Sequence, residues 1–529
     1  MRFPSSCASG LSAIWLVATL LCRRPCVTQG QIYTFEREKV PANRSLHTLI
    51  AFYVYSYEEA PEKQEGQPFV KFKQLHLEEA VASRPPASDA ILQYEGIQLS
   101  MMRYRDFGNL IDPQKFCSTQ TDVDVGRADK KDQLLVTKSN PRMSYKDVNV
   151  YVHTVRFGSY RDEKADLAKT GVYILVFSNC GGFMDAAVSG TVIVKNAYGF
   201  LPGNEYHKMT FYGWLLVIYV GLALAWMVLS IRWWRELFAI QNCIAVVIFL
   251  GLLECILWFT FFNDWNQSGV RGKFLFVFAI LLTVVKSTFS YMLVLVASLG
   301  WGITRPYLDI QVLLKIQVLS FLYIVLDFIR EAVLSFRQSH SLSIAFVLLC
   351  LLPVSLLNGA IFSWVFEALS GLMETLKERR QFEKLALFQR LWKILIAALV
   401  GATLTLLFQI FNLSRSITAR WKYQWLLTDG ISHVLFLFVL ASMMYLWAPH
   451  KYSQRYAFSH QIGSVDTEDR DHRPGAIWAD EDAIDDEGED AESFWATTKG
   501  SNALGDESIH PTNAKAQVDV IGASARERS

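Results

Sequence analysis

The sequence has few charged residues for its length and almost no net charge. Of its 529 residues 19% are charged, and 51 Lys and Arg nearly balance 50 Asp and Glu, which leaves a net charge of +1. A nucleic-acid-binding protein usually presents a basic face, so this balance argues against that class of partner. The hydrophobic share of 52% excludes an intrinsically disordered chain and indicates a membrane protein.

The sequence also lacks the motifs of several enzyme and receptor classes. It has no Gly-x-Ser-x-Gly nucleophile motif, and Gly300–Gly302 does not continue into a dinucleotide-binding fingerprint, since position 305 is Arg. No Cys or His cluster has metal-ligand spacing. The last hydrophobic stretch contains no lysine for retinal, and the Asp-Arg-Tyr and Asn-Pro-x-x-Tyr signatures of ordinary G-protein-coupled receptors are absent. We therefore expect no enzyme, no cofactor and no metal site.

The N-terminus has the features of a signal peptide. After a positively charged start, residues 11–22 form an apolar stretch of about 12 residues, which is too short to span a bilayer. Thr28 and Gly30 are small residues that suit cleavage. We expect residues 1–30 to be removed and the mature chain to begin near Gln31 in the secretory lumen. A signal anchor that stays attached is the alternative.

Cysteine is scarce in the part of the chain that should face the lumen. Of the eight cysteines, three lie in the leader (Cys7, Cys22, Cys26) and three lie in hydrophobic segments (Cys243, Cys255, Cys350). The other two are Cys117 and Cys180. The last two are alone in an oxidising compartment, so we expect a disulfide between Cys117 and Cys180.

Residues 31–210 are mixed in character and read as an antiparallel β-sandwich. β-Branched and aromatic runs alternate there with turn residues. The runs are Thr48–Tyr57, Phe69–Leu77, Val148–Phe157, Val172–Ser178 and Thr191–Val194. Asn43 begins a glycosylation sequon, which fits a luminal position.

Residues 211–447 contain seven apolar stretches that are long enough to cross a membrane. These are Phe211–Ile231, Leu237–Phe262, Phe274–Ile303, Val312–Leu334, Leu342–Leu369, Leu391–Phe411 and Leu426–Trp447. A luminal N-terminus followed by seven crossings puts the C-terminus in the cytosol, and the loops on that side carry more Lys and Arg. Asn266 and Asn412 begin further sequons on the luminal side.

The remaining residues, 448–529, are polar and predict a disordered cytosolic tail. Asp and Glu dominate the block Asp466–Glu492, and such a block stays solvated. It is either a sorting signal or a solubilising tail.

Of the ionisable residues inside the predicted spans, five are candidates for function. Glu254 and Lys286 fall on neighbouring helices at depths that allow them to pair, and Asp327, Asp429 and His433 lie in the same half of the membrane. This clustering predicts a cavity open to the lumen that admits a lipid headgroup or a cargo segment. The alternative is that the Glu–Lys pair only holds helices together.

Several strings of the sequence carry a family resemblance. They are GVYILVFSNC (171–180), NAYGFLPGNE (196–205), WWRELFAIQ (233–241), VIFLGLLE (247–254), SLGWGITRPYLD (298–309) and LWAPHKYSQRYAFS (446–459). On these strings the chain resembles the lung seven-transmembrane receptor family of GOLD-domain seven-helix proteins, and within it the Golgi branch called transmembrane protein 87.

The resemblance implies a luminal GOLD-like β-sandwich on a helical bundle similar to that of the Wnt carrier Wntless. It further implies residence in the Golgi membrane and work in membrane trafficking or in cargo handling. The expected partners are a membrane phospholipid in the bundle, protein cargo and sorting machinery. Two alternatives remain: a cation channel or transporter, and a receptor that signals to the cytosol.

Overall fold

The computed structural model describes residues 31–449 apart from short gaps. The gaps are 41–45, 64–65, 83–96, 113, 127, 129–130, 137–150, 156–161, 181–182, 305–306, 340–343 and 414–416. The predicted leader, Asn43, the Asn412 side chain and the acidic tail lie outside what the structure describes.

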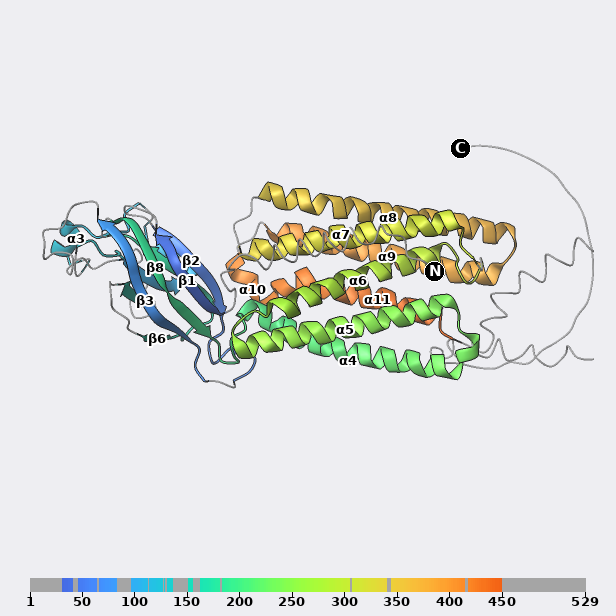
Figure 1. The fold of residues 1–529 in the computed structure, drawn as a ribbon, viewed down its shortest axis with the longest axis horizontal. Coiled ribbons are helices and arrows are strands. Elements are labelled where there is room, and N and C mark those ends of the chain that lie inside the picture. The colour runs from blue at the N-terminus through green and yellow to red at the C-terminus, as the bar shows by residue number, and fades with distance from the viewer. Residues whose placement is uncertain are drawn as a thin grey trace, which may run out of the picture. The chain divides into compact units, whose positions relative to one another are not determined.

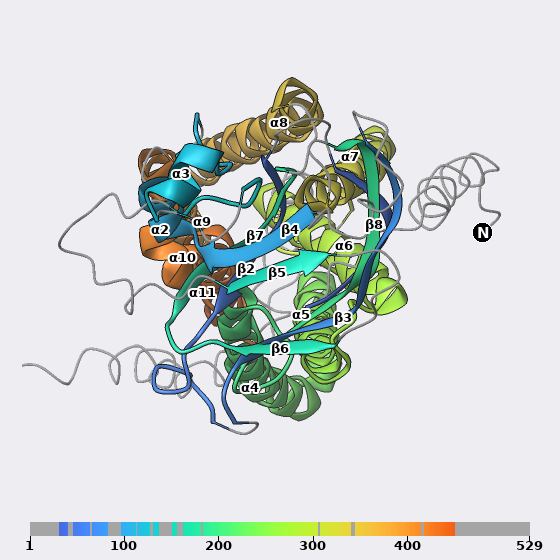
Figure 2. The same cartoon turned by 90° about the vertical axis from the view of Figure 1, so that its left-hand side faces the viewer.

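Two four-stranded antiparallel sheets form the N-terminal part (Figures 1 and 2). One sheet has the order β1 (Ile32–Val40), β8 (Phe183–Lys195), β3 (Phe69–Ala82), β6 (Glu163–Asp166). The other has the order β2 (Leu46–Val54), β7 (Gly171–Ser178), β4 (Ile97–Arg103), β5 (Tyr151–Val155). A shared apolar core that includes Phe72 and Val194 of the first sheet and Phe52 and Phe177 of the second packs between them. The predicted β-sandwich is therefore confirmed.

The second sheet is covered on its outer face as well, by a small helical layer. Along β7, Tyr173 and Leu175 point into the sandwich core, while Ile174 and Val176 belong to a separate apolar cluster. This alternation follows from the two-residue period of a strand. The cluster includes residues of the helix α2 (Tyr104–Leu110), and the layer also contains α3 (Gln120–Asp124). We predicted no helix in this region, because both helices are too short to show a helical period.

The Cys117–Cys180 disulfide ties this helical layer to the end of β7. Asp122 strengthens the layer: it accepts a hydrogen bond of 2.8 Å from Lys115 Nζ and another of 3.0 Å from the Thr119 backbone N–H. These contacts, led by the one with Lys115, hold the pKa of the Asp122 carboxyl well below its usual range. The layer is thus fixed by the disulfide and by charged contacts, which include that of Arg103 with Asp106 of α2.

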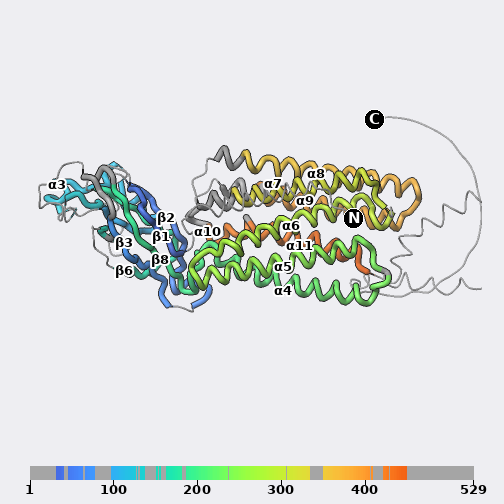
Figure 3. The backbone as a smooth tube through the Cα atoms, viewed as in Figure 1, coloured from blue at the N-terminus to red at the C-terminus, as the bar shows by residue number. Residues whose placement is uncertain are grey.

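In the part of the chain that the structure describes, eight α-helices and two short helical turns follow the sandwich (Figures 1 and 3). They are α4 (Gly203–Arg232), α5 (Ala239–Ser268), α6 (Lys273–Ser298), α7 (Ile310–Ser339), α8 (Ile344–Glu378), α9 (Phe382–Leu413), α10 (Ile417–Trp425), the π-helical turn η3 (Leu426–Gly430) and α11 (Ile431–Leu446); the 3-10 turn η2 (Trp234–Glu236) lies between α4 and α5. Among the described residues, α4 to α9 are long and apolar enough to cross a membrane, whereas α11 alone is shorter.

The seventh predicted crossing is completed by the turn that precedes α11. Residues 426–446 of η3 and α11 are continuous, and about 20 residues suffice to span the hydrocarbon core. Most of the other helices extend beyond their predicted limits. For example, α4 begins at Gly203, so the predicted boundary at residue 210 falls inside it. Hydropathy detects the apolar centre of a helix and misses polar end turns such as those of α4.

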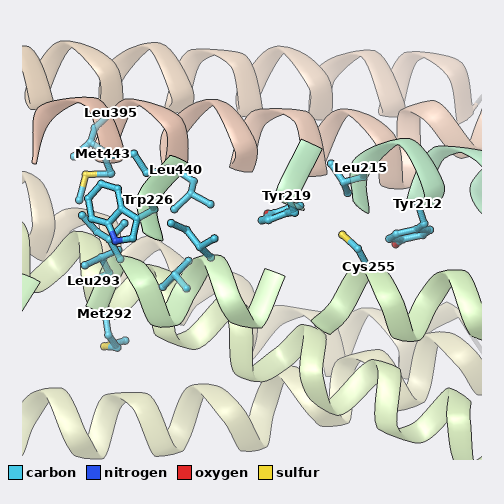
Figure 4. Packing of buried hydrophobic residues seen from close by; sticks show 14 of the residues in the cluster. Tyr212, Leu215, Tyr219, Trp226, Cys255, Met292, Leu293, Leu395, Leu440 and Met443 are labelled. Carbon is cyan, nitrogen blue, oxygen red and sulfur yellow. The ribbon is translucent and has the colours of Figure 1, made fainter. Parts of the chain in front are cut away.

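The bundle core combines buried side chains from all of the helices α4 to α11, and Figure 4 shows part of it. Labelled members are Tyr212, Leu215, Tyr219 and Trp226 of α4, Cys255 of α5, Met292 and Leu293 of α6, Leu395 of α9, and Leu440 and Met443 of α11. Gly251 of α5 faces the ring of Tyr219, where a Cβ atom would clash. A small residue at this position therefore lets α4 and α5 approach each other closely.

We expect the disulfide to contribute strongly to the stability of the sandwich, because it closes a loop with a sequence separation of 63 residues. The variant Cys117→Ser/Cys180→Ser should lose about 2 to 5 kcal/mol of unfolding free energy. Thermal melting of the purified full chain measures this loss. A variant with the free thiols Cys243 and Cys350 changed to Ser is the control. Equal melting temperatures for the two variants would contradict the prediction.

Candidate functional site

Polar side chains meet between the first membrane helix and the last. Lys208 Nζ of α4 lies 2.9 Å from Glu205 Oε2 on its own helix and 2.9 Å from Asp429 Oδ2 in η3. Four residues further along both helices, the Tyr212 hydroxyl lies 3.0 Å from His433 Nε2. Residues four apart lie on one helical face, so both contacts belong to the same interface.

A buried ion pair continues this series into α5 and α6. Lys286 Nζ donates to Glu254 Oε2 at 2.5 Å, and the side chains are 4% and 0% exposed. Lys286 Nζ also lies 4.5 Å from the ring centroid of Phe436, which follows His433 by one turn on α11. We call the set of Lys208, Asp429, Tyr212, His433, Lys286 and Glu254 the polar row.

The π-helical turn η3 lies where the polar row begins. It spans Leu426–Gly430 and contains Asp429. Single π-turns within α-helices are rare and occur frequently at functional sites. Here the turn carries a carboxylate that pairs with Lys208 of another helix.

Aromatic rings surround the inner part of the polar row. The ring of Tyr212 stacks on Trp258 and Phe262 of α5 at centroid distances of 5.9 and 6.0 Å. Because Glu254 and Lys286 are buried, this pair does not line an opening to water, which differs from the cavity that we expected there. The two charges offset each other in a dry site, so removal of one leaves the other buried and unpaired.

Asp327 stands apart from the other four candidates. It lies on α7, is 1% exposed, and pairs with Arg330 Nη2 at 2.9 Å; Arg330 also contacts Glu331 Oε1 at 2.7 Å. Its helix packs near Tyr291, whose ring lies 5.3 Å from that of Tyr323, one turn before Asp327. The structure thus brings together Glu254, Lys286, Asp429 and His433 and places Asp327 in a second polar cluster.

A second set of contacts joins the sandwich to α10, and we call it the junction. The ring of Trp421 packs against Tyr53 and Tyr55 at centroid distances of 5.4 and 4.9 Å. Lys422 Nζ lies 2.7 Å from Glu59 Oε2, and this hydrogen bond lowers the pKa of Glu59. Because α10 runs directly into η3, the junction and the polar row share one continuous helix.

The connection from β8 to α4 is also held firmly. Asn266, in the last turn of α5, donates from Nδ2 to Tyr198 O at 2.9 Å, and its Oδ1 accepts from Leu201 N at 3.1 Å. Gly199 has a φ of +134° and abuts Asn266, where no Cβ atom would fit. The amide nitrogen that a glycan needs is therefore already engaged, which argues against use of the Asn266 sequon.

Sequence reasoning missed Lys208, Tyr212 and the junction. Lys208 and Tyr212 have the four-residue spacing of one helical face, but they lie around the boundary that we placed between sandwich and membrane. The position of Trp421 at the end of a predicted span suits a membrane-interface anchor, but nothing local links Trp421 or Lys422 to the sandwich. Their partners Tyr53 and Glu59 lie more than 350 residues earlier; the Glu59–Lys422 separation is 363. Such contacts depend on the tertiary fold.

We expect the Glu254–Lys286 pair to show the energetics of a buried ion pair. Glu254→Gln or Lys286→Met alone should destabilise the protein by about 3 to 5 kcal/mol, while the double variant Glu254→Gln/Lys286→Met should recover most of that loss. Thermal melting of the four proteins in one detergent gives the coupling. Lys315→Met, at an exposed lysine of α7, is the control. Additive losses would show that the two side chains do not act as a pair.

Comparison with known proteins agrees with this architecture. The sequence profile described as "GOST, seven transmembrane domain" matches residues 207–454. Transmembrane protein 87A of Xenopus tropicalis is 32% identical over 285 residues, which cover 53% of this chain and 51% of the relative. Transmembrane protein 87A of Homo sapiens is 32% identical over 287 residues, covering 54% and 50%.

A more distant relative is the membrane protein PTM1 of Saccharomyces cerevisiae, which is 26% identical over 337 residues and covers 61% of both chains. The chain spans about half the length of the transmembrane protein 87A relatives that it matches. The profile begins within α4 and ends after α11, so it covers the bundle that holds the polar row. The chain is therefore a multi-pass membrane protein whose residues 207–454 match the GOST seven-transmembrane domain, and over about half of its length it is similar to the transmembrane protein 87A proteins.

Proposed function

We propose that this protein acts in membrane trafficking in the Golgi, where it handles cargo or lipid. In this proposal the sandwich faces the lumen and the C-terminus lies in the cytosol. The signal-peptide-like leader, the loop charges and the family resemblance support this placement. The sandwich would recognise protein cargo, the helical bundle would contact a membrane phospholipid, and the acidic tail would meet sorting machinery.

The observation that carries the proposal is the single helical path from the junction to the polar row. Trp421 and Lys422 hold the sandwich, and Asp429 and His433 follow on the same continuous helix. A partner that shifts the sandwich would therefore also move η3. Since Asp429 pairs with Lys208 of α4, this motion would change how the first and last helices are held together.

The π-turn suits such a role because it is a local irregularity that a small rotation can relocate. Two events could change the position of the π-turn. Cargo that binds the sandwich would act through the junction, and lipid that packs around α11 would act from the other end of the helix. A ligand shifts such an equilibrium only by its difference in affinity for the two arrangements. If the junction is removed, the sandwich should still bind cargo, but this binding should no longer lead to transport.

We expect loss of the junction to abolish transport while the protein still folds. In cells that lack the protein, we would express the wild type, Trp421→Ala/Lys422→Ala or Tyr423→Ala and follow secreted and surface proteins by quantitative mass spectrometry. Tyr423 is the matched control, since it lies beside Lys422 on α10 and its side chain is 69% exposed. Some cargo should be retained in the cells that lack the protein. Cells that express Tyr423→Ala should secrete this cargo at the wild-type rate, whereas cells that express the double variant should secrete it as slowly as cells without the protein.

Two further measurements make this test decisive. The melting temperature of the double variant tests whether it is folded. The single variant Lys422→Arg, which keeps the charge opposite Glu59, should support more transport than the double variant and less than the wild type. Full rescue by Trp421→Ala/Lys422→Ala would reject the coupling. Identical secretion by deficient and wild-type cells would reject the trafficking function itself.

The polar row also favours a second candidate, a cation channel or transporter. Its charged and hydrogen-bonding groups reach from Lys208 at the start of α4 to the Glu254–Lys286 pair. However, this pair is buried and neutralised, so the inner end of the row lacks the hydrated lining that conduction requires.

We therefore expect purified protein in liposomes to give no selective cation current. Currents would be recorded across a range of voltages, with protein-free liposomes as the baseline. A selective current that Lys286→Ala or Glu254→Gln abolishes would contradict this expectation and would favour the channel function over the trafficking function.

A further inference from the structure

Gln31, at the start of the sandwich, is buried without a side-chain partner. It is 0% exposed, and neither Nε2 nor Oε1 has a hydrogen-bond partner. Its backbone carbonyl is satisfied, since it accepts from Val194 N at 2.7 Å. Buried polar groups without partners are rare in native structures, and a primary amide leaves two donors and one acceptor unsatisfied.

The surroundings explain why this position is dry. The next residue, Ile32, pairs with Ile193 across the sheet and packs against Gly269 at the end of α5, where a Cβ atom would clash with the Ile32 side chain. This end of β1 therefore lies against the bundle. Water has no access to satisfy the Gln31 amide.

Gln31 is also the first residue after the predicted cleavage site at Thr28 and Gly30. Cleavage there would leave an α-amino group on Gln31, and such a group is charged near neutral pH. An ammonium on a fully buried residue carries a large desolvation cost unless a carboxylate pairs with it. Cleavage alone would thus add a charge to a residue that already has unsatisfied polar atoms.

We propose that Gln31 is cyclised to pyroglutamate once the leader has been removed. The α-amino nitrogen attacks Cδ of the side-chain amide and forms a five-membered lactam. The Cδ–Nε2 bond breaks, a proton moves from the attacking nitrogen to the leaving group, and ammonia departs. The step needs no oxidant or co-reactant, and the ring geometry holds the reacting atoms close together.

The product fits the site better than the unmodified residue. A single neutral lactam replaces a charged ammonium and a primary amide, so fewer polar atoms are buried. The backbone carbonyl that accepts from Val194 is untouched, and β1 keeps its pairing with β8. The modification would therefore stabilise the sandwich where it meets the bundle.

The test is mass spectrometry of the N-terminal peptide of the full-length protein, expressed in cells that process secretory leaders. We expect a peptide that begins at position 31 and is lighter than the free-glutamine form by one ammonia. It should resist Edman degradation until pyroglutamyl aminopeptidase removes the first residue. Gln31→Ala, which cannot cyclise, should give a free amine, and a glutaminyl cyclase inhibitor should increase the uncyclised fraction of the wild type.

The possible failures are distinguishable. A peptide that begins at position 31 with intact glutamine would overturn the cyclisation and leave the secretory placement standing. A peptide that still contains leader residues, or that begins elsewhere, would overturn both the cyclisation and the cleavage on which it rests. As a second readout, the uncyclised wild type and Gln31→Ala should both melt at a lower temperature than the cyclised protein; equal melting temperatures would overturn the stabilising role.

Discussion

The arrangement of the helices and the sandwich depends on the ion pairs of Lys208. It bonds Glu205 on its own helix and Asp429 in the π-turn, so the first membrane helix is held to the last one by charge. Directly before it, His207 Nε2 lies 3.0 Å from the hydroxyl of Tyr55, which belongs to the junction. One turn of α4 therefore connects the sandwich, the start of the bundle and its end.

The polar row combines two environments with different consequences. At its outer end the Asp429 side chain is 38% exposed and that of Lys208 18%, so water screens this pair more than it screens a fully buried one. At its inner end Glu254 and Lys286 are buried among aromatic rings, and any change there is expensive. The polar row is thus partly hydrated at its outer end and dry at its inner end.

Much of the fold follows from local patterns. The predicted runs correspond to β2, β3, β5, β7 and β8, whose apolar and aromatic content is high, whereas β1 and β6 were missed because charged residues interrupt them. β4 was missed for a different reason: its neighbours along the chain give no regular alternation, and both of its faces are covered. The seven membrane segments were found from hydropathy alone. The errors lie at their ends: α4 begins earlier than predicted, in polar residues, and α6 ends at Ser298, before the predicted limit at Ile303.

The sequence by itself determined which segments enter the membrane, where five of the eight described strands lie, and which ionisable residues would lie at depth, because hydropathy and strand period are local properties. It also indicated the pairing of Glu254 with Lys286, since adjacent antiparallel helices bring residues of similar depth together; these two are 32 residues apart. Only the tertiary structure decided that His433 meets Tyr212, 221 residues away, and that Lys422 meets Glu59 across 363 residues. The physical reason is that such contacts depend on how the first and last helices pack and on how the sandwich sits against them, and no local pattern encodes either.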